Sequence, residues 1–230
     1  MFRDDFILRH IRLFVQAIAK ALGLIKEGDL GFALETVRVS FSDLLGMSLD
    51  DFLAYPDDRV KDFLYFGELG PMGLNRTAFA AGMLAIAGRI HAAQDRPELS
   101  QACFEKALRV LLETVLGEEE EIEIPEFAPP IDEILEAVPV QSLNDDLLTM
   151  VAFHFDRTGQ IRRAEEAIRV LFERNPDEPD IRDTVRSFYE YLLDLDETDL
   201  RASGVEVEAA RDLCIRLQSR RSHGCSDNNP

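Results

Sequence analysis

The stretch that most restricts the fold is DRTGQIRRAEEAIRVLFERNPD, residues 156–177. Gly159 permits a tight chain reversal, and Pro176 cannot continue a helix. On both sides of the glycine, apolar residues recur every three or four positions, which indicates two amphipathic helices. Antiparallel helices approach closely where small side chains meet, and Ala152 and Ala164 stand where these helices would cross. The segment therefore predicts a tightly packed helical hairpin.

The same spacing occurs twice upstream. The small residue at the predicted crossing is Ala33 in the first copy, Ser100 in the second and Ala164 in the third. These positions are 67 and 64 residues apart. Gly28 and Asp95 stand at the place of the turn glycine. The sequence therefore predicts three hairpins with one register.

This unit resembles the tetratricopeptide repeat, whose period is 34 residues. The two intervals are close to twice that period, so the resemblance implies degenerate helix pairs at 48–75 and 117–143, and another after 180. It also implies an all-α fold, a right-handed stack of antiparallel helix pairs. Such an α-solenoid would hold about 9 to 11 helices and little or no sheet. A bundle of unrelated helical hairpins is the alternative.

Four segments also resemble an uncharacterised bacterial family of helical, repeat-like proteins. They are DDFILRHIRLFVQAIAKALGL, KEGDLGFALETVRVSFSDLLG, RTGQIRRAEEAI and SFYEYLLDLDETDLRASGVEVEAARDL. Together they would place most of the chain within that resemblance. It implies a helical fold and leaves the activity open.

Helical periodicity, caps and breakers predict the individual helices. The predicted ranges are 5–26, 29–46, a short helix from 49 capped by Ser48, 56–66, 75–93 capped by Asn75, 97–116 opened by Pro97, 131–137, a helix to about 157 capped by Asn144 or Asp145, 161–174, 180–195 and 206–218. Helix 5–26 has one narrow polar stripe, so we expect it to be buried on several sides. Residues 1–218 are predicted as one domain with a candidate hinge at 117–130, which is rich in acids and prolines. Residues 219–230 are predicted as a flexible tail.

Charge narrows the set of partners. The chain has 44 acidic against 25 basic residues and a formal net charge of −19. Such a chain repels nucleic acid and anionic membranes unless its basic residues form a separate face. The arginines between 157 and 186 are interspersed with acids, as on a solvated helix surface. We therefore expect no nucleic-acid partner.

Other features favour a cytoplasmic location without membrane association. No apolar run reaches about 18 residues, the minimum for a spanning helix. The segment MFRDDFILRH has acids ahead of its apolar part, unlike a secretory signal. Cys103, Cys214 and Cys225 are odd in number and lack metal-type spacing, so we interpret them as free thiols.

Motifs for catalysis or metal binding are not found in the sequence. No His-x-x-x-His pair occurs, and the histidines and cysteines do not form a zinc-type pattern. Neither Gly-x-Ser-x-Gly nor Gly-x-x-x-x-Gly-Lys occurs. We therefore predict a non-enzymatic protein with no catalytic residue, no metal site and no cofactor.

Stacked helix pairs bind partners on the concave face that the first helices line. The predicted groove residues are Ala85, Arg89, Thr149, Phe153, Asp156 and Arg157. The predicted function is a protein-interaction module or scaffold, whose groove takes a basic or amphipathic peptide or partner helix. Alternatively, a neighbouring helix of the same chain packs against these positions.

Two further functions are left open by the sequence. The first is a structural homo-oligomer, such as a homodimer, because terminal repeats need a polar outer face and helix 5–26 is strongly apolar. Its predicted interface residues are Phe6, Ile7, Phe14 and Ile18. The second is a small-molecule binder or enzyme with a cavity between helices.

Overall fold

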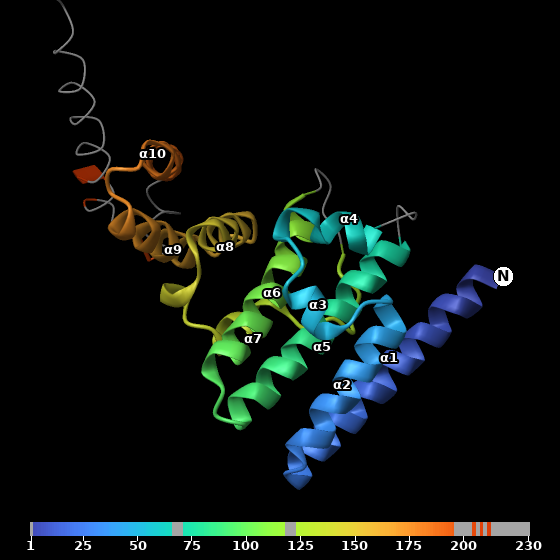
Figure 1. The fold of residues 1–230 in the computed structure, drawn as a ribbon. Coiled ribbons are helices and arrows are strands. Elements are labelled where there is room, and N and C mark those ends of the chain that lie inside the picture. The colour runs from blue at the N-terminus through green and yellow to red at the C-terminus, as the bar shows by residue number, and fades with distance from the viewer. Residues whose placement is uncertain are drawn as a thin grey trace, which may run out of the picture. The chain divides into compact units, whose positions relative to one another are not determined.

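The computed structural model of the protein describes residues 2–65, 71–117 and 123–195, together with positions 204, 205, 208, 211 and 212. These described residues form ten α-helices and two 3-10 helices and contain no strand, which confirms the all-α class (Figure 1). The elements are α1 (Phe2–Glu27), α2 (Leu30–Leu45), α3 (Leu49–Leu53), η1 (Asp57–Arg59), α4 (Val60–Tyr65), α5 (Pro71–Ala93), α6 (Pro97–Leu116), α7 (Ile131–Ala137), η2 (Val140–Ser142), α8 (Asp145–Arg157), α9 (Ile161–Arg174) and α10 (Pro179–Asp194).

The chain divides into two compact units, residues 1–143 and 144–230. The first unit holds α1 to α7, and the second holds α8 to α10. The division falls after the candidate hinge at 117–130, and the single domain over 1–218 stays a prediction. The predicted tail, and all but three positions of the predicted helix 206–218, lie outside the described residues.

Three hairpins, α1/α2, α5/α6 and α8/α9, contain the same turn. The turn residue is left-handed in each: Gly28 has φ 82°, Asp95 has φ 59° and Gly159 has φ 72°. The next N–H donates to the carbonyl five residues earlier, at 2.9, 2.9 and 2.7 Å respectively. This bond satisfies a carbonyl that the helix end leaves unpaired. The sequence prediction that Asp95 takes the place of a turn glycine is thereby confirmed.

Small residues lie inside each hairpin, as predicted. Ala33 and Ala164 are fully buried, and Ser100 is 7% exposed. A Cβ atom at Gly88 would lie 2.9 Å from two atoms of the Phe104 ring, so the aromatic side chain occupies the room that the glycine leaves. Close approach in the α5/α6 hairpin therefore depends on pairing a small residue with a large one.

Local end signals are confirmed at several helices. Ser48 Oγ accepts a hydrogen bond from the Asp51 N–H at 3.1 Å, and Asn144 Oδ1 accepts one from the Leu147 N–H at 2.9 Å. Pro97 occupies the first turn of α6. Each of these signals acts within a few residues, where it satisfies or removes an unpaired N–H donor.

The start of α5 differs from the sequence prediction. Asn75 is not a cap, because α5 begins at Pro71 and Asn75 lies inside it, 8% exposed. Proline fits a first helical turn since its fixed φ suits the helix and its missing N–H is not needed there. Gly73, which stands between the predicted helices 56–66 and 75–93, is helical, and a Cβ atom there would lie 2.6 Å from the Tyr65 ring.

The central helix of the first unit is α5 and not α1. α5 packs against α1, α2, α4 and α6, and residues 77–88 are all buried. The prediction that helix 5–26 is buried on several sides is wrong, because Leu8, Leu13 and Val15 on α1 are 50%, 44% and 49% exposed. Both helices are apolar on most sides, and only the number of helices packed around each of them decides which one is buried.

The segments between the hairpins are shorter than full helix pairs. Residues 48–65 form α3, η1 and α4, and residues 123–143 form α7 and η2. The described part of the candidate hinge is anchored, because the Phe127 ring lies 5.5 Å from Phe14 and 5.4 Å from Phe79. Complete degenerate pairs at 48–75 and 117–143 are therefore not what the described residues form.

Candidate functional site

In the second unit, α8 places two residues beside its buried stripe. The side chains that face the core of the unit are Leu147, Leu148, Val151, Ala152 and Phe155. Phe153 and Asp156 are three positions apart and therefore lie on one neighbouring face. Packing of α8 on α9 fixes the direction of that face.

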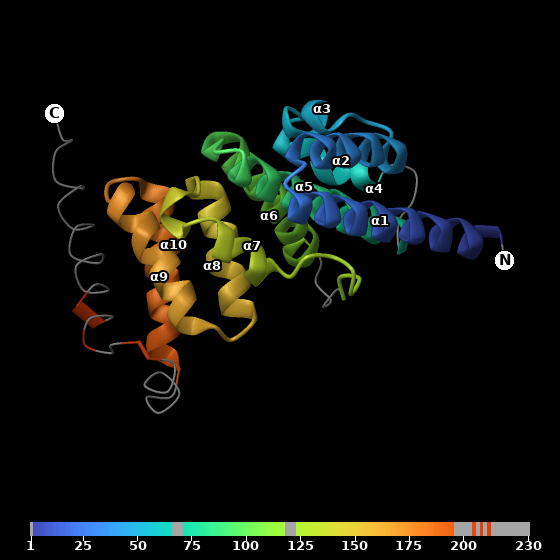
Figure 2. The same cartoon turned by 90° about the horizontal axis from the view of Figure 1, so that it is seen from below.

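α10 is fixed on α9 by its own buried residues, Val185, Tyr189 and Leu192. The Tyr189 hydroxyl donates a hydrogen bond to Glu165 Oε1 on α9 at 2.7 Å. Burial, together with this bond, raises the pKa of Tyr189. Figure 2 shows α8, α9 and α10 close together, and both α8 and α10 pack on α9.

A groove with a volume of about 480 Å³ lies where residues of α8 and α10 come together over α9. This volume is in the range of about 300 to 1,000 Å³ that ligand pockets occupy. The groove is lined by Ala152, Phe153, Asp156, Ile168, Asp183, Thr184, Ser187, Phe188 and Tyr191.

Aromatic surface dominates the exposed walls of the groove. Phe153 is 52% exposed and Tyr191 is 45% exposed. Phe188 adds a third ring, and Ser187 adds a hydroxyl. Apolar surface that gathers in a hollow, with polar groups beside it, is typical of a binding site.

Asp156 is the unusual polar group of the groove. Its Oδ1 atom is buried and has no hydrogen-bond partner. Burial raises the pKa of Asp156 above its ordinary value. A buried oxygen without a partner costs free energy, so the ionised form of this carboxyl group is less stable here than in water.

The other carboxylate of the groove, Asp183, has a partner. Its Oδ1 accepts a hydrogen bond from Arg186 Nη2 at 2.7 Å, and Arg186 Nε also lies 3.8 Å from Glu190 Oε1. Asp183 is 59% exposed at its side chain, so water reaches it. The two carboxylates therefore differ in both solvation and pairing.

The structure brings two of the six predicted groove residues, Phe153 and Asp156, into one groove. Thr149 is half-buried, and its hydroxyl donates to the Asp145 carbonyl at 2.8 Å. Arg157 is exposed and is not a lining residue.

The remaining two predicted groove residues belong to the first unit. Ala85 is 4% exposed, so it is part of the core and does not line an open surface. Arg89 is exposed and forms an ion pair with Glu133 of α7. A single groove built from both units stays a prediction.

Sequence reasoning missed the contribution of α10. Its lining residues Asp183, Thr184, Ser187, Phe188 and Tyr191 recur at spacings of three and four. That spacing marks one helix face. The signal available in the sequence was the presence of two aromatic residues and an aspartate on that face.

The fold buries or half-buries three of the four residues predicted to form an oligomer interface. Phe14 is 3% exposed and packs against Phe79 at 5.1 Å, so it belongs to the core of this chain. Ile7 and Ile18 are half-buried, and the side chain of Phe6 lies outside the described part. The apolar side chains that α1 does expose are Leu8, Leu13 and Val15.

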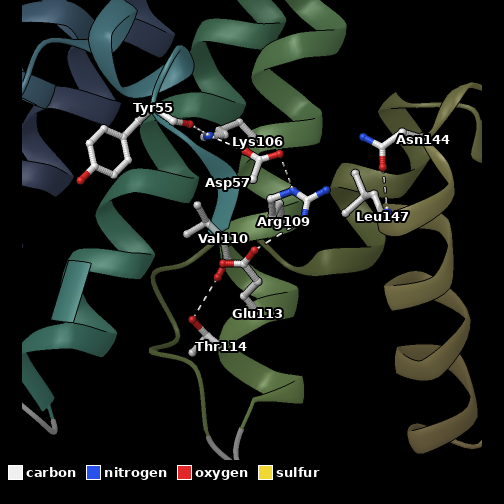
Figure 3. Close-up of polar contacts among 9 residues, drawn as sticks. All are labelled: Tyr55, Asp57, Lys106, Arg109, Val110, Glu113, Thr114, Asn144 and Leu147. Carbon is white, nitrogen blue, oxygen red and sulfur yellow. Dashed lines mark hydrogen bonds and ion pairs between the residues drawn. The ribbon is translucent and has the colours of Figure 1, made fainter. Parts of the chain in front are cut away.

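A cluster of buried charges lies in the first unit (Figure 3). Lys106 Nζ lies 2.5 Å from Asp57 Oδ1 and donates to the Tyr55 carbonyl at 2.5 Å. Arg109 Nε lies 3.0 Å from Asp57 Oδ2, and Nη1 lies 3.6 Å from Glu113 Oε1. Both cations are nearly buried, with side-chain exposures of 6% and 8%. One aspartate thus ties the irregular segment before α4 to α6.

Cys103 is fully buried in α6. Burial raises the pKa of its thiol to about 12. The thiolate is the nucleophilic form, so this cysteine is not placed for covalent chemistry near neutral pH.

Within the described ranges, no three His, Cys, Asp or Glu side chains are grouped so as to hold a metal ion. Among the same residues, no helix combines the length and apolarity needed to cross a bilayer. No protein-family model, no curated protein and no solved structure matches the chain.

Proposed function

We propose that the chain is a non-enzymatic interaction module of tetratricopeptide-like helix pairs. In this proposal, the α8/α10 groove binds an amphipathic helical segment of a partner protein. The observation that supports it best is the hollow at that place, with two half-exposed aromatic side chains, Phe153 and Tyr191. Aromatic residues in such positions often supply most of the binding energy of an interface.

The repeat supports the architectural half of the proposal. Three hairpins share one turn and one register of small residues. In a stack of such pairs, the first helices line the inner face, which is where partner segments dock. α8 and α10 would be the first helices of consecutive pairs, with α9 between them.

Replacing the exposed aromatic residue of α8 should strongly weaken binding. We expect Phe153→Ala to lower the affinity for the peptides selected by the wild-type chain about tenfold or more. The peptides come from a display library of random sequences of about 12 residues, long enough for three helical turns. They should carry apolar residues at helical spacing, and fluorescence polarisation measures their affinity.

Phe32→Ala is the matched control, because Phe32 is 56% exposed but lies on α2 in the first unit. It should leave the affinities unchanged. If no helical apolar peptide is selected, or if both variants weaken binding equally, the proposed groove is wrong.

A second candidate function, a homodimer, is favoured by a different observation. Leu8 and Val15 are seven positions apart on α1 and are both about half exposed, so they form one apolar stripe. Under this candidate, a second copy of the chain covers the stripe.

Light scattering tests the homodimer directly. A dimer has twice the chain mass of 26.0 kDa, and Val15→Glu should return it to the monomer mass, since an unpaired charge in an apolar interface is costly. A wild-type mass of 26.0 kDa at high concentration would remove this candidate.

A further inference from the structure

We propose that the α8/α10 groove selects a cation. In this proposal, Asp156 binds the guanidinium or ammonium group of an arginine or lysine in the partner segment, while Phe153 and Tyr191 pack against its alkyl stem. The inference rests on the proposed function, because it names the chemistry that the same groove would recognise.

The first support is the buried oxygen of Asp156 without a hydrogen-bond partner. A donor that carries a positive charge makes the strongest hydrogen bonds to a carboxylate. The terminal carboxyl torsion is broad and nearly two-fold, so either oxygen can be presented to a ligand. A bound cation would stabilise the negative charge of a carboxylate that burial has partly removed from water.

The second support is the chemistry of the other walls. Phe153, Phe188 and Tyr191 offer rings, which attract a cation held over them and also bury a methylene stem. Ser187 offers a hydroxyl that can accept a hydrogen bond. Asp183 accepts a hydrogen bond from Arg186 through Oδ1 and has a second carboxylate oxygen, Oδ2.

The third support is the sign of the charge in the groove. Its described lining residues include two carboxylates and neither lysine nor arginine. The arginines next to lining residues in the sequence, Arg157, Arg169, Arg182 and Arg186, are not lining residues themselves, and Arg186 is paired with Asp183. A chain with a net charge of −19 also attracts cationic segments from a distance.

Two peptides separate the cation from the apolar contact. The first is an alanine-based helix of about 12 residues, with leucines at i and i+4 and one arginine in the following turn. The second has citrulline in place of the arginine, which keeps the shape of the side chain but replaces the guanidinium by a neutral urea. Fluorescence polarisation of both is measured with the wild-type chain, with Asp156→Asn and with Glu173→Gln.

Glu173→Gln is the charge-matched control. Glu173 is exposed on α9 of the same unit and does not line the groove. It therefore removes the same negative charge from the unit as Asp156→Asn does.

We expect the wild-type chain to bind the arginine peptide about ten- to a hundredfold more tightly than the citrulline peptide. Asp156→Asn should reduce the affinity for the arginine peptide to that for the citrulline peptide, and should leave the citrulline peptide unchanged. Glu173→Gln should preserve the preference.

Equal wild-type affinity for both peptides would overturn the cation site and leave the apolar groove standing. An equal loss of both peptides in Asp156→Asn, or the same loss of preference in Glu173→Gln, would also overturn it. Binding of neither peptide would overturn both the cation site and the proposed function.

A stability measurement separates binding from a structural role. Because the buried oxygen has no partner in the folded unit, Asp156→Asn should raise the thermal unfolding midpoint while it removes the preference for arginine. A lowered midpoint would mean that the carboxylate supports the fold, and it would count against the proposal.

Discussion

Phe155→Ala is expected to destabilise the second unit by about 3–5 kcal/mol. The Phe155 side chain is 1% exposed and lies where α8 meets α9, one turn before the hairpin. The guanidinium of Arg163 lies 4.1 Å from the ring centroid, so the substitution also removes a cation–π contact. Such a loss is a large share of the stability of a small domain, which is about 5–15 kcal/mol.

Urea unfolding measures this loss of stability. Hydrogen exchange detected by mass spectrometry shows where in the chain the loss occurs. Exchange should accelerate in the peptides of 145–194 and stay unchanged in those of α5 and α6. Phe153→Ala is the control. It also replaces a phenylalanine by alanine, but Phe153 stands two positions before Phe155 and is half exposed. It should cost much less stability while weakening peptide binding about tenfold or more. Equal destabilisation by the two variants would contradict the packing described for α8.

The second large effect is expected for the buried charges of the first unit. Asp57→Ala should destabilise this unit by about 2–4 kcal/mol, because it leaves Lys106 and Arg109 buried without their shared anion. Both cations are less than a tenth exposed, whereas Asp57 is 46% exposed. Water can reach the aspartate side of the cluster, so the effect should be below that of a fully buried pair.

Lys106→Met is the informative comparison. It removes the buried charge itself and keeps a side chain of similar volume, so it should cost only about 1 kcal/mol or less. In this variant Asp57 still pairs with Arg109 and is still in contact with solvent. Chemical denaturation of both variants should therefore give the larger loss for the substitution at the exposed residue. The reverse order would mean that the Lys106 ammonium, with its hydrogen bond to the Tyr55 carbonyl, contributes more stability than Asp57 does, and it would contradict this expectation.

Much of the secondary structure could be predicted from the sequence. The signals at Ser48, Asn144 and Gly159 act on backbone groups within five residues. Backbone donors and acceptors at helix ends need partners nearby, so the local sequence carries this information. The prediction for Asn75 failed because a good capping residue stood four positions after a proline that could begin the helix equally well.

The candidate site was predicted only in part, for a related reason. Phe153 and Asp156 lie on one helix, and their common face follows from helical spacing alone. Their partners Ser187 and Tyr191 are more than 30 positions away on α10, and only the packing of both helices on α9 brings them into one groove.

The sequence by itself determined the all-α class, the hairpin turns and the small residues that let paired helices approach. Only the tertiary structure decided that α5 and not α1 is the buried centre of the first unit, that Phe127 anchors the acidic segment, and that Asp57 joins two cations about 50 residues away. The physical reason is that turns and caps satisfy nearby backbone groups, whereas burial depends on the total fit of surfaces that distant segments provide.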